Sequence, residues 1–564
     1  MIGMLANCLT VLGLSQWDVP PPVPKPPVPK PKLVVVCVID QLRGDYPLRW
    51  KAQMGPGGFR RIMEQGTHFT NCHYPFAYTV TGPGHATIAT GALPAVHGII
   101  GNNWYDNNLA EMVYCATSSR HKNFPEKPGA KKTGGSAERL LVPTIGEALK
   151  DATNGKSKVI ALSSKDRGAI LLAGAKSDGC YWWDTETGLL GSSTYFGNAL
   201  PGWVTQWNQK GVAKQWLGTS WERFRPEIDY TGLSGPDEIL GEGEGANKKQ
   251  GRVFPHPFPK ELGKEYYNAV YASPFANEVL LSASFQAIES EQLGQHDSTD
   301  LLMLSFSSND LVGHSWGPDS QEVLDITLRT DDLLQRLFTR LDEKIGKGQW
   351  TVYLSADHGV CPLPEVSKAK GLDAGRIHPS LLKLGMENHL HDAFGEPDPK
   401  VSFFAGELDE NLYLNRPYLK SRGLDVERVA QSLAKWLTLQ TGIQKVYTRG
   451  DLLKSVKEAD SLRDMCRNSF HPDRSGDLMV ILKPFWLVSN GTGTTHGMPH
   501  PYDTHVPLMI LGAGIPTLSS EERVTPLHVA VIMAAQLGIP TPKGSTLELP
   551  QSLANLLGKN GATK

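Results

Sequence analysis

Residues 33–40 read LVVVCVID, and this stretch determines the fold class that the sequence predicts. The seven residues before the aspartate are apolar, and five of them are β-branched. An unbroken run of this kind is typical of a strand buried on both faces of a parallel sheet. Because open α/β sheets bind ligands beyond the carboxyl ends of their strands, Asp40 is a candidate site residue. An aspartate that only caps a loop would give the same pattern.

Comparable apolar runs alternate with helical patterns along the rest of the chain. Strands are predicted at residues 158–162, 301–305, 351–355, 477–482 and 506–511. Helices are predicted at residues 57–66, 85–91, 140–151, 320–346 and 525–537, with Ser320 as the N-cap of the longest. This alternation predicts an α/β fold with a doubly wound, mostly parallel sheet sandwiched by helices.

Two stretches depart from the alternation. Residues from about 179 to 285 are rich in Trp, Tyr, Gly and Pro, and we expect a loop-rich insertion that caps the site. Residues from about 361 to 474 have a mixed character and form a second expected insertion. We therefore expect one catalytic domain over residues 33–556 that carries two insertions.

The charge balance gives no sign of a polyanionic partner. The chain has 564 residues, with 56 basic and 58 acidic side chains and a formal net charge of −2. That balance argues against nucleic acid as a dedicated partner. No internal run of eighteen or more apolar residues occurs, so we expect no transmembrane domain in the mature protein.

The N-terminus has the composition of an export segment. Residues 1–17 begin with an apolar stretch about as long as a signal-peptide core, although a basic start is missing. Residues 18–32 (DVPPPVPKPPVPKPK) have the composition of a stiff polyproline linker. We expect an exported protein, periplasmic or secreted, that is either cleaved or tethered to a membrane at its N-terminus. The alternative is a tail without function.

Seven cysteines are scattered along the chain, and no CxxC pair occurs among them. A thiolate zinc site is therefore not expected. Cys37 lies inside the apolar run 33–39 and is predicted to be a buried thiol. One or two disulfides could form among the other cysteines in an oxidising compartment.

Residues 78–102 (YTVTGPGHATIATGALPAVHGIIGN) contain the candidate nucleophile, Thr81. Thr81 precedes Gly-Pro-Gly and stands at the start of a helical pattern, where unpaired N–H groups and the helix dipole favour negative charge. Such a setting suits an alkoxide that attacks a phosphorus or sulfur ester. The alternative is that Thr81 only caps the helix.

Polar residues follow the other predicted strands. Lys165 and Arg167 come just after the strand at 158–162, and two cations one residue apart could both contact a phosphate. A solvated pair of cations on the protein surface would show the same sequence spacing. Three carboxylates and three imidazoles lie at strand ends: Asp40, Asp310, His314, Asp357, His358 and His496. Oxygen and nitrogen ligands without a thiolate suit zinc, with another divalent ion as the alternative, and six ligands fit two ions that keep open positions.

Four further histidines are expected to be structural, namely His85, His97, His500 and His505.

The order of these motifs along the chain resembles the alkaline phosphatase superfamily. Within it, the chain is most similar to the monomeric bacterial alkaline phosphatases with a threonine nucleophile, close relatives of the nucleotide pyrophosphatase/phosphodiesterases. The resemblance implies an alkaline phosphatase-like fold and two zinc ions per chain. It implies that one zinc is held by Asp40, Asp357 and His358, with Thr81 as the reactive ligand. It implies that the other zinc is held by Asp310, His314 and His496.

The resemblance also implies the reaction. Asn102 would donate to a phosphoryl oxygen, and Lys165 and Arg167 match the pair that marks monoesterases in this group. The expected activity is a zinc-dependent phosphomonoesterase that forms a phosphothreonine on Thr81. The expected partners are small-molecule phosphate monoesters, and the expected state is a monomer. The alternatives are a phosphodiesterase or nucleotide pyrophosphatase on the same site, and an inactive metal-dependent binding protein.

Overall fold

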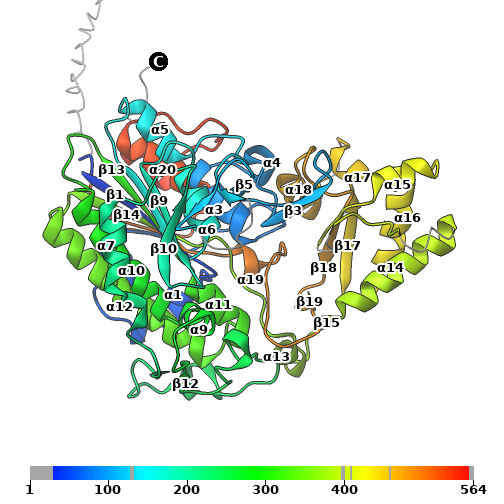
Figure 1. Ribbon diagram of the computed structural model, residues 1–564, viewed down its shortest axis with the longest axis horizontal. Helices are drawn as coiled ribbons and strands as arrows, with labels where there is room; N and C mark the ends of the chain where they lie inside the picture. The colour runs from blue at the N-terminus through cyan, green and yellow to red at the C-terminus, as the bar shows by residue number, and fades with distance from the viewer. Residues whose placement is uncertain (1–28, 127–132, 396–400, 407–409, 456–458, 558–564) are drawn as a thin grey trace, which may run out of the picture.

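A ten-stranded sheet forms the centre of the computed structural model, which describes residues 29–126, 133–395, 401–406, 410–455 and 459–557 (Figure 1). In spatial order its strands are β21 (Leu518–Ser520), β2 (Thr67–Phe69), β20 (Leu508–Gly512), β14 (Trp350–Ser355), β1 (Leu33–Ile39), β13 (Asp300–Phe306), β8 (Val159–Ser163), β9 (Gly179–Asp184), β10 (Leu189–Ser193) and β6 (Asn123–Phe124).

The five central strands, β14 to β9 in that order, are parallel. Strand β1 lies between β13 and β14, with Cys37 opposite Leu304 on one side and Leu354 on the other. Every residue of β1 is buried, which confirms the interpretation of the run 33–39. Towards the edges, β20 pairs antiparallel with β14 and β10 pairs antiparallel with β9. The predicted α/β fold with a mostly parallel sheet is therefore confirmed.

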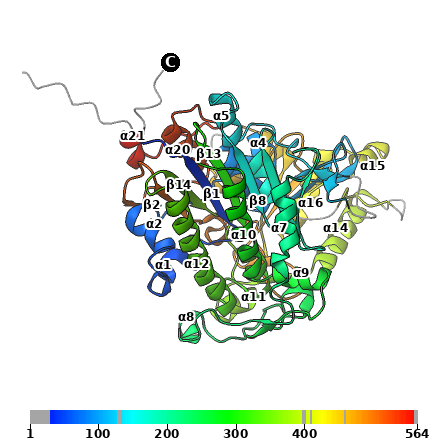
Figure 2. The same ribbon diagram turned by 60° about the vertical axis from the view of Figure 1, so that its left-hand side comes forward.

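Two groups of helices cover the two faces of the sheet (Figures 1 and 2). One group packs together from α3 (Thr81–Thr90), α5 (Ile145–Ala152), α6 (Asp166–Ala173) and α20 (His528–Leu537). The other contains α7 (Gly202–Lys210), α10 (Phe275–Ser290) and α12 (Gln321–Lys344). Helix α12 begins after Ser320, whose hydroxyl accepts a hydrogen bond from the Val323 N–H, so the predicted N-cap is confirmed.

Several predicted boundaries move for local reasons. Helix α5 begins at Ile145 rather than 140, because Thr144 and Glu147 form a capping box there. Helix α3 begins at Thr81 rather than 85, because Pro83 falls in the first turn, where its missing N–H is not needed. The helix expected at 57–66 is α2 (Phe59–Gln65).

A second, smaller lobe has its own three-stranded antiparallel sheet and lies at the right of Figure 1. The sheet consists of β16 (Asn411–Leu412), β18 (Leu478–Leu482) and β17 (Ile443–Thr448), accompanied by α14 (Pro379–Phe394), α15 (Arg416–Ser421), α16 (Val426–Thr438), α17 (Arg449–Leu453) and α18 (Ser461–Ser469). Buried apolar residues of these elements form a core separate from that of the main sheet. The strand predicted at 477–482 therefore exists, but it belongs to this lobe and not to the main sheet.

Both expected insertions differ from the observed architecture at their boundaries. The stretch 179–285 begins with β9 and β10 of the main sheet and ends in α10, which packs on that sheet. The stretch 361–474 continues further, because β19 (Trp486–Val488) pairs with β15 (Gly375–Ile377). The aromatic residues of β9, at Tyr181–Trp183, have the same composition as a Trp- and Tyr-rich loop, which explains the first difference.

The cysteines in the described ranges are all buried and free: Cys37, Cys72, Cys115, Cys180, Cys361 and Cys466. The prediction for Cys37 is confirmed, and disulfides among the others are not observed there. The expectations for residues 1–17 and for most of 18–32 lie outside the described residues. Within the described ranges, no helix combines the length and apolar character needed to cross a bilayer.

The first turn of α3 lies directly against the end of β14. A Cβ atom added at Gly84 would lie 2.2 Å from the backbone oxygen of Asp357, which is closer than non-bonded atoms can approach. Helix α3 can therefore approach this loop only because residue 84 has no side chain.

We expect Gly84→Ala to lower the apparent free energy of unfolding by about 1–3 kcal/mol, because the methyl group forces α3 away from the loop at Asp357. The matched control is Gly202→Ala, at the first residue of α7, where an added Cβ meets nothing within 4 Å. Chemical denaturation followed by circular dichroism measures both variants. Equal midpoints for the two would contradict the close packing of α3.

Candidate active site

The parallel strands bring most of the predicted polar residues to one edge of the sheet, but Thr81 begins α3, and His496 comes from the loop after β19 rather than from a strand end. Asp40 follows β1 directly, and Asp357 and His358 follow β14. Strand β13 leads into α11 (Ser308–Trp316), which carries Asp310 in its first turn and His314 in its last. Strand β8 leads to the start of α6, where the two predicted cationic residues, Lys165 and Arg167, lie.

The first candidate ligand group consists of Asp40, Asp357 and His358. One potential ligand atom from each lies within 4.8 Å of the others. The Nε2 atom of His358 lies 3.4 Å from Oδ1 of Asp40 and 3.3 Å from Oδ2 of Asp357. All three residues are fully buried, and burial lowers the pKa of His358 to about 3, so its imidazole is neutral and can act as a ligand.

The second candidate ligand group consists of Asp310, His314 and His496, again with ligand atoms within 4.8 Å of one another. Nε2 of His314 lies 3.1 Å and Nε2 of His496 lies 3.5 Å from Oδ1 of Asp310. Burial opposes ionisation of Asp310, but His314 and Lys165 hold its pKa well below the usual range. Asp310 therefore remains a carboxylate.

Hydrogen bonds fix the tautomers of the three imidazoles. Nδ1 of His314 donates to the Thr494 carbonyl at 2.7 Å, and Nδ1 of His496 donates to the Thr79 carbonyl at 2.8 Å. Nδ1 of His358 likewise donates to the carbonyl of Gly359 at 2.9 Å. Because carbonyl oxygens only accept, each histidine presents the lone pair of Nε2 to its ligand group.

The residues fit two metal ions. Oδ1 of Asp40 and Oδ2 of Asp357 are buried and accept no hydrogen bond from the described part of the chain. Buried acceptors that face one another without donors are costly unless a cation satisfies them. The rings of His358 and His496 stack with centroids 3.4 Å apart, so the two ligand groups adjoin. Imidazole nitrogens and carboxylate oxygens without thiolate are a donor set that suits zinc.

Thr81 lies between these groups and the two cationic residues. It is the first residue of α3, and Val80 is the N-cap, so the alternative that Thr81 only caps the helix is wrong. Oγ1 of Thr81 lies 3.5 Å from Nε2 of His358, 3.5 Å from Nζ of Lys165 and 3.4 Å from Nη2 of Arg167. A hydroxyl in this position can lose its proton to form a stabilised alkoxide.

Lys165 connects the two ligand groups. Its Nζ lies 2.7 Å from Oδ2 of Asp40 and 2.6 Å from Oδ2 of Asp310, so each carboxylate turns Oδ1 towards a ligand group and Oδ2 towards the lysine. Burial alone would lower the pKa of Lys165, but the carboxylates of Asp310 and Asp40 raise it above its ordinary value. Lys165 therefore stays protonated.

Asn102 and Arg167 are oriented by their neighbours. Oδ1 of Asn102 accepts a hydrogen bond from the Gly82 N–H at 2.8 Å, which leaves the amide NH₂ group as the donor available to the cavity that Asn102 lines. Nη1 of Arg167 donates to the Tyr114 hydroxyl at 3.3 Å, and that hydroxyl donates to Asp166 at 2.5 Å. No pattern in the sequence pointed to Tyr114.

His85 also belongs to the site, although it was expected to be structural. Its Nδ1 lies 2.9 Å from the Thr81 carbonyl and 3.3 Å from Oδ2 of Asp357, and its Nε2 lies 2.8 Å from the Ser305 hydroxyl. His85 therefore holds the Thr81 carbonyl and lies close to a candidate ligand. The other three histidines form hydrogen bonds with residues outside the ligand groups. His97 contacts Thr87, His500 contacts the Leu482 carbonyl, and His505 contacts the Thr70 carbonyl.

A cavity of about 700 Å³ opens onto the site. Thr81, Asn102, Arg167 and the second ligand group line one side, and the smaller lobe lines the other. The residues from 179 to 285 were expected to form the cap, but the lobe covers this cavity instead. Residues 179–285 instead contribute Tyr271 to a neighbouring pocket that Lys165 and Arg167 also line.

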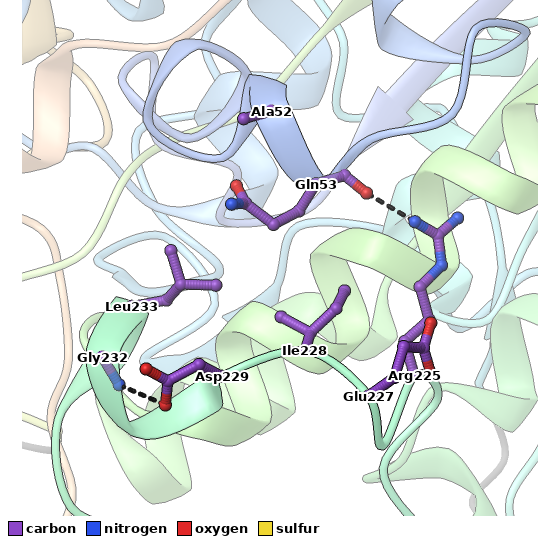
Figure 3. Close-up of a pocket in the computed structure, with 8 residues that line it drawn as sticks. All are labelled: Ala52, Gln53, Arg225, Glu227, Ile228, Asp229, Gly232 and Leu233. Atoms are coloured by element: carbon purple, nitrogen blue, oxygen red, sulfur yellow. Dashed lines mark hydrogen bonds between the residues drawn. The ribbon is translucent and has the colours of Figure 1, made fainter.

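Another hollow, of about 550 Å³, lies away from these residues (Figure 3). Two pairs of its polar groups are already hydrogen-bonded: Arg225 donates to the Gln53 carbonyl, and Asp229 accepts from the Gly232 N–H. It contains none of the predicted site residues, so we do not assign it a part in the chemistry.

Comparisons with known proteins agree with the motifs. The family of type I phosphodiesterases/nucleotide pyrophosphatases matches residues 34–505. The chain is 34% identical to alkaline phosphatase PhoV of Synechococcus elongatus, over 96% of this chain and 98% of that protein. It is also 34% identical to alkaline phosphatase PafA of Elizabethkingia meningoseptica, over 96% of this chain and 97% of that protein. A crystal structure of wild-type alkaline phosphatase PafA is similar with a TM-score of 0.86 at 33% identity, covering 94% of this chain and 100% of that one.

The family match includes the smaller lobe and the main sheet apart from Leu33, β20 and β21. The resemblance that the motifs indicated is therefore confirmed. The chain belongs to the type I phosphodiesterase/nucleotide pyrophosphatase family, within the alkaline phosphatase superfamily.

Proposed function

We propose that this chain is a zinc-dependent phosphomonoesterase, an alkaline phosphatase that hydrolyses phosphate monoesters and releases inorganic phosphate. The observation that carries the proposal is the position of Thr81 Oγ1, within 3.5 Å of His358, Lys165 and Arg167. The names of the two relatives, both alkaline phosphatases at 34% identity over nearly the full length, support the same activity.

In the proposed first step, Oγ of Thr81 attacks phosphorus in line with the departing ester oxygen. The hydroxyl releases its proton to solvent water, a bond forms from Oγ to phosphorus, and the bond from phosphorus to the alcohol oxygen breaks. The alcohol leaves with a proton from water, and a phosphothreonine remains. Zinc bound by the two ligand groups would supply charge that lowers the pKa of the Thr81 hydroxyl and of water and stabilises the leaving oxygen.

In the second step, water attacks phosphorus from the side opposite Thr81, and the bond from phosphorus to Oγ breaks. Phosphate leaves with the water oxygen, and Thr81 regains a proton in place of the one that the water loses. Arg167, Lys165 and the amide of Asn102 would hold the non-bridging oxygens through both steps. The cationic nitrogens lie 3.4 and 3.5 Å from Oγ1 of Thr81, within reach of a phosphoryl group attached there.

The main alternative is a phosphodiesterase or nucleotide pyrophosphatase, which the family description also names. The pair Lys165 and Arg167 favours the monoesterase, because a monoester dianion carries one more negative charge than a diester. Two cations beside the nucleophile recognise that charge, whereas a second ester group would need an apolar contact in their place.

We further propose that the enzyme is exported, periplasmic or secreted, and acts as a monomer on small-molecule phosphate monoesters. The apolar segment 1–17 and the Pro/Lys-rich segment 18–32 support export.

Zinc removal tests the metal requirement. We expect a strong chelator to abolish hydrolysis of an aryl phosphate monoester, zinc to restore it, and metal analysis to give one zinc for each of the two ligand groups. Thr81→Ala is expected to keep both ions but to lose about 10³-fold or more in kcat, since the nucleophile is missing. Full activity in the stripped enzyme would refute the zinc mechanism, and full activity in Thr81→Ala would place the nucleophile elsewhere.

Arg167→Ala tests the monoesterase assignment. We expect kcat/KM for an aryl monoester to fall by about 10²–10³-fold, and for the matching diester by less than about tenfold, because the diester lacks the second charge. Lys165 is less suitable for this test, since it also pairs with Asp40 and Asp310. The control is Arg60→Ala, at an exposed pair with Glu64. Equal losses for both esters would favour the diesterase.

A further inference from the structure

The cavity that opens onto Thr81 is larger than phosphate alone requires. Its volume of about 700 Å³ falls in the range of sites that enclose a whole small molecule. Thr81, Asn102 and Arg167 occupy one end, where the phosphoryl group would bind. The rest of the cavity is therefore available to another part of the substrate.

The other end of the cavity is lined by apolar side chains of the smaller lobe. They come from α14, β16, β18 and β19, and include Leu382, Met386, Leu412, Val480, Leu482 and Val488. Lys383 and Glu410 add one potential charge of each sign, so the lining as a whole does not select for a charged group. A surface of this composition favours an uncharged apolar group.

The apolar end lies on the side where the alcohol must leave. In-line attack by Thr81 places the departing oxygen opposite Oγ1. Because Oγ1 lies 3.5 Å from His358 of the first ligand group, we infer that the departing oxygen faces the second group. Asp310, His314 and His496 line the same cavity as the apolar wall, whereas the first ligand group is not among the described residues that line it. The leaving alcohol therefore faces the lobe.

We propose that this apolar wall is a subsite for the alcohol part of the substrate, and that the enzyme prefers monoesters of large apolar or aromatic alcohols. The proposal rests on the proposed phosphomonoesterase activity. Leu382 is the most informative wall residue, because it is only half-buried and can therefore be replaced with less damage to the lobe core than Met386, which is 2% exposed.

The test compares 1-naphthyl phosphate with glycerol 3-phosphate, using the zinc-loaded full-length enzyme. We expect Leu382→Ser to lower kcat/KM for the naphthyl ester about 5- to 20-fold more than for the glycerol ester, because apolar contact with the leaving group is lost. Leu382→Phe keeps an apolar surface and should retain the preference. The matched control is Leu381→Ser, on the same helix, where Leu381 is 67% exposed and outside the cavity lining.

The outcomes separate this proposal from the proposed function. Equal losses for both esters, or the same change of ratio in Leu381→Ser, would overturn the subsite while leaving the phosphomonoesterase intact. If Leu382→Ser does not fold, Val488→Thr, at the half-buried end of β19, tests the same wall with nearly unchanged side-chain volume. If the unsubstituted enzyme hydrolyses neither ester, the proposed function fails and the subsite with it.

A separate observation concerns Gln41, which follows the candidate ligand Asp40. Its backbone has φ of 63°, in the left-handed region that a residue with a side chain rarely adopts, and it is 3% exposed. Such a conformation costs free energy that glycine would avoid, and it persists where surrounding contacts require it.

Gln41 contacts both candidate ligand groups. Its backbone N–H donates to Oδ1 of Asp357 at 3.1 Å, and its side-chain Nε2 donates to Oδ1 of Asp310 at 2.7 Å. An added Cβ at Gly313 would lie 1.8 Å from Oε1 of Gln41, so the glutamine amide is pressed against the backbone of α11. One residue thus orients one carboxylate in each group.

We infer that Gln41 is a positioning residue that holds Asp310 and Asp357 in the orientation needed to bind two zinc ions. Donors that orient metal-binding carboxylates raise metal affinity by fixing the geometry before the metal arrives. The left-handed backbone is required because it directs the N–H group towards Asp357 and the side chain towards Asp310.

Gln41→Gly separates strain from positioning. Glycine relieves the backbone strain at residue 41, so the thermal midpoint of the chelator-treated protein should stay equal or rise. Glycine also removes the side-chain amide that donates to Asp310, so the affinity for zinc should fall about 10- to 100-fold. Gln41→Glu keeps the length but loses the donor and should also bind zinc more weakly. A titration against a competing chelator measures affinity without any enzyme assay.

The control is Gln292→Gly, at an exposed residue with φ of 52° after α10, which makes the same substitution in the same backbone region away from the site. It should leave zinc affinity unchanged. Unchanged affinity in Gln41→Gly, or retained affinity in Gln41→Glu, would overturn the positioning role.

Discussion

Three carboxylates, Asp40, Asp310 and Asp357, meet inside the protein at one edge of the sheet, and their mutual repulsion is the constraint on which the site depends. Carboxylates removed from water are stable only beside positive charge. Lys165 pairs with Asp40 and Asp310, and none of the contacts above brings it to Asp357. Burial and the nearby Asp357 still raise the pKa of Asp40 well above its usual range. Burial lowers the pKa values of His358 and His496, so these two imidazoles add lone pairs and little charge, and bound cations would complete the arrangement.

The parts that follow from local sequence could be predicted. Strand β1 is buried on both faces, which leaves an unbroken apolar run, and a polar residue directly after such a run must emerge at the carboxyl edge. The same reasoning placed Asp310 and Asp357, because parallel strands share that edge. Thr81 was identified by the glycines around it, one of which, Gly84, allows α3 to contact the Asp357 loop.

The parts that depend on contacts between distant segments could not be predicted. Tyr114 meets Asp166 across 52 positions of sequence, and Gln41 meets Asp310 across 269. The apolar sequence pattern of β18 is the same whichever sheet the strand joins, so the sequence does not assign β18 to the smaller lobe. The order of the motifs along the chain implied the two sets of metal ligands through a family resemblance. The histidine tautomers, the hydrogen-bond donors and the side-chain orientations could be determined only from the structure.

The fold separates two demands that a phosphatase meets. Chemistry at phosphorus requires atoms fixed within a fraction of an ångström, and here most of those atoms come from the ends of packed parallel strands, with Thr81 from the start of α3. Contact with the alcohol requires only a surface of suitable shape and polarity, and that surface comes from a lobe with its own hydrophobic core. Because substitutions at sites without shared contacts act nearly independently, α14 and its neighbours can change while the sheet edge stays fixed. Substrate preference can therefore differ between relatives that share one reaction centre.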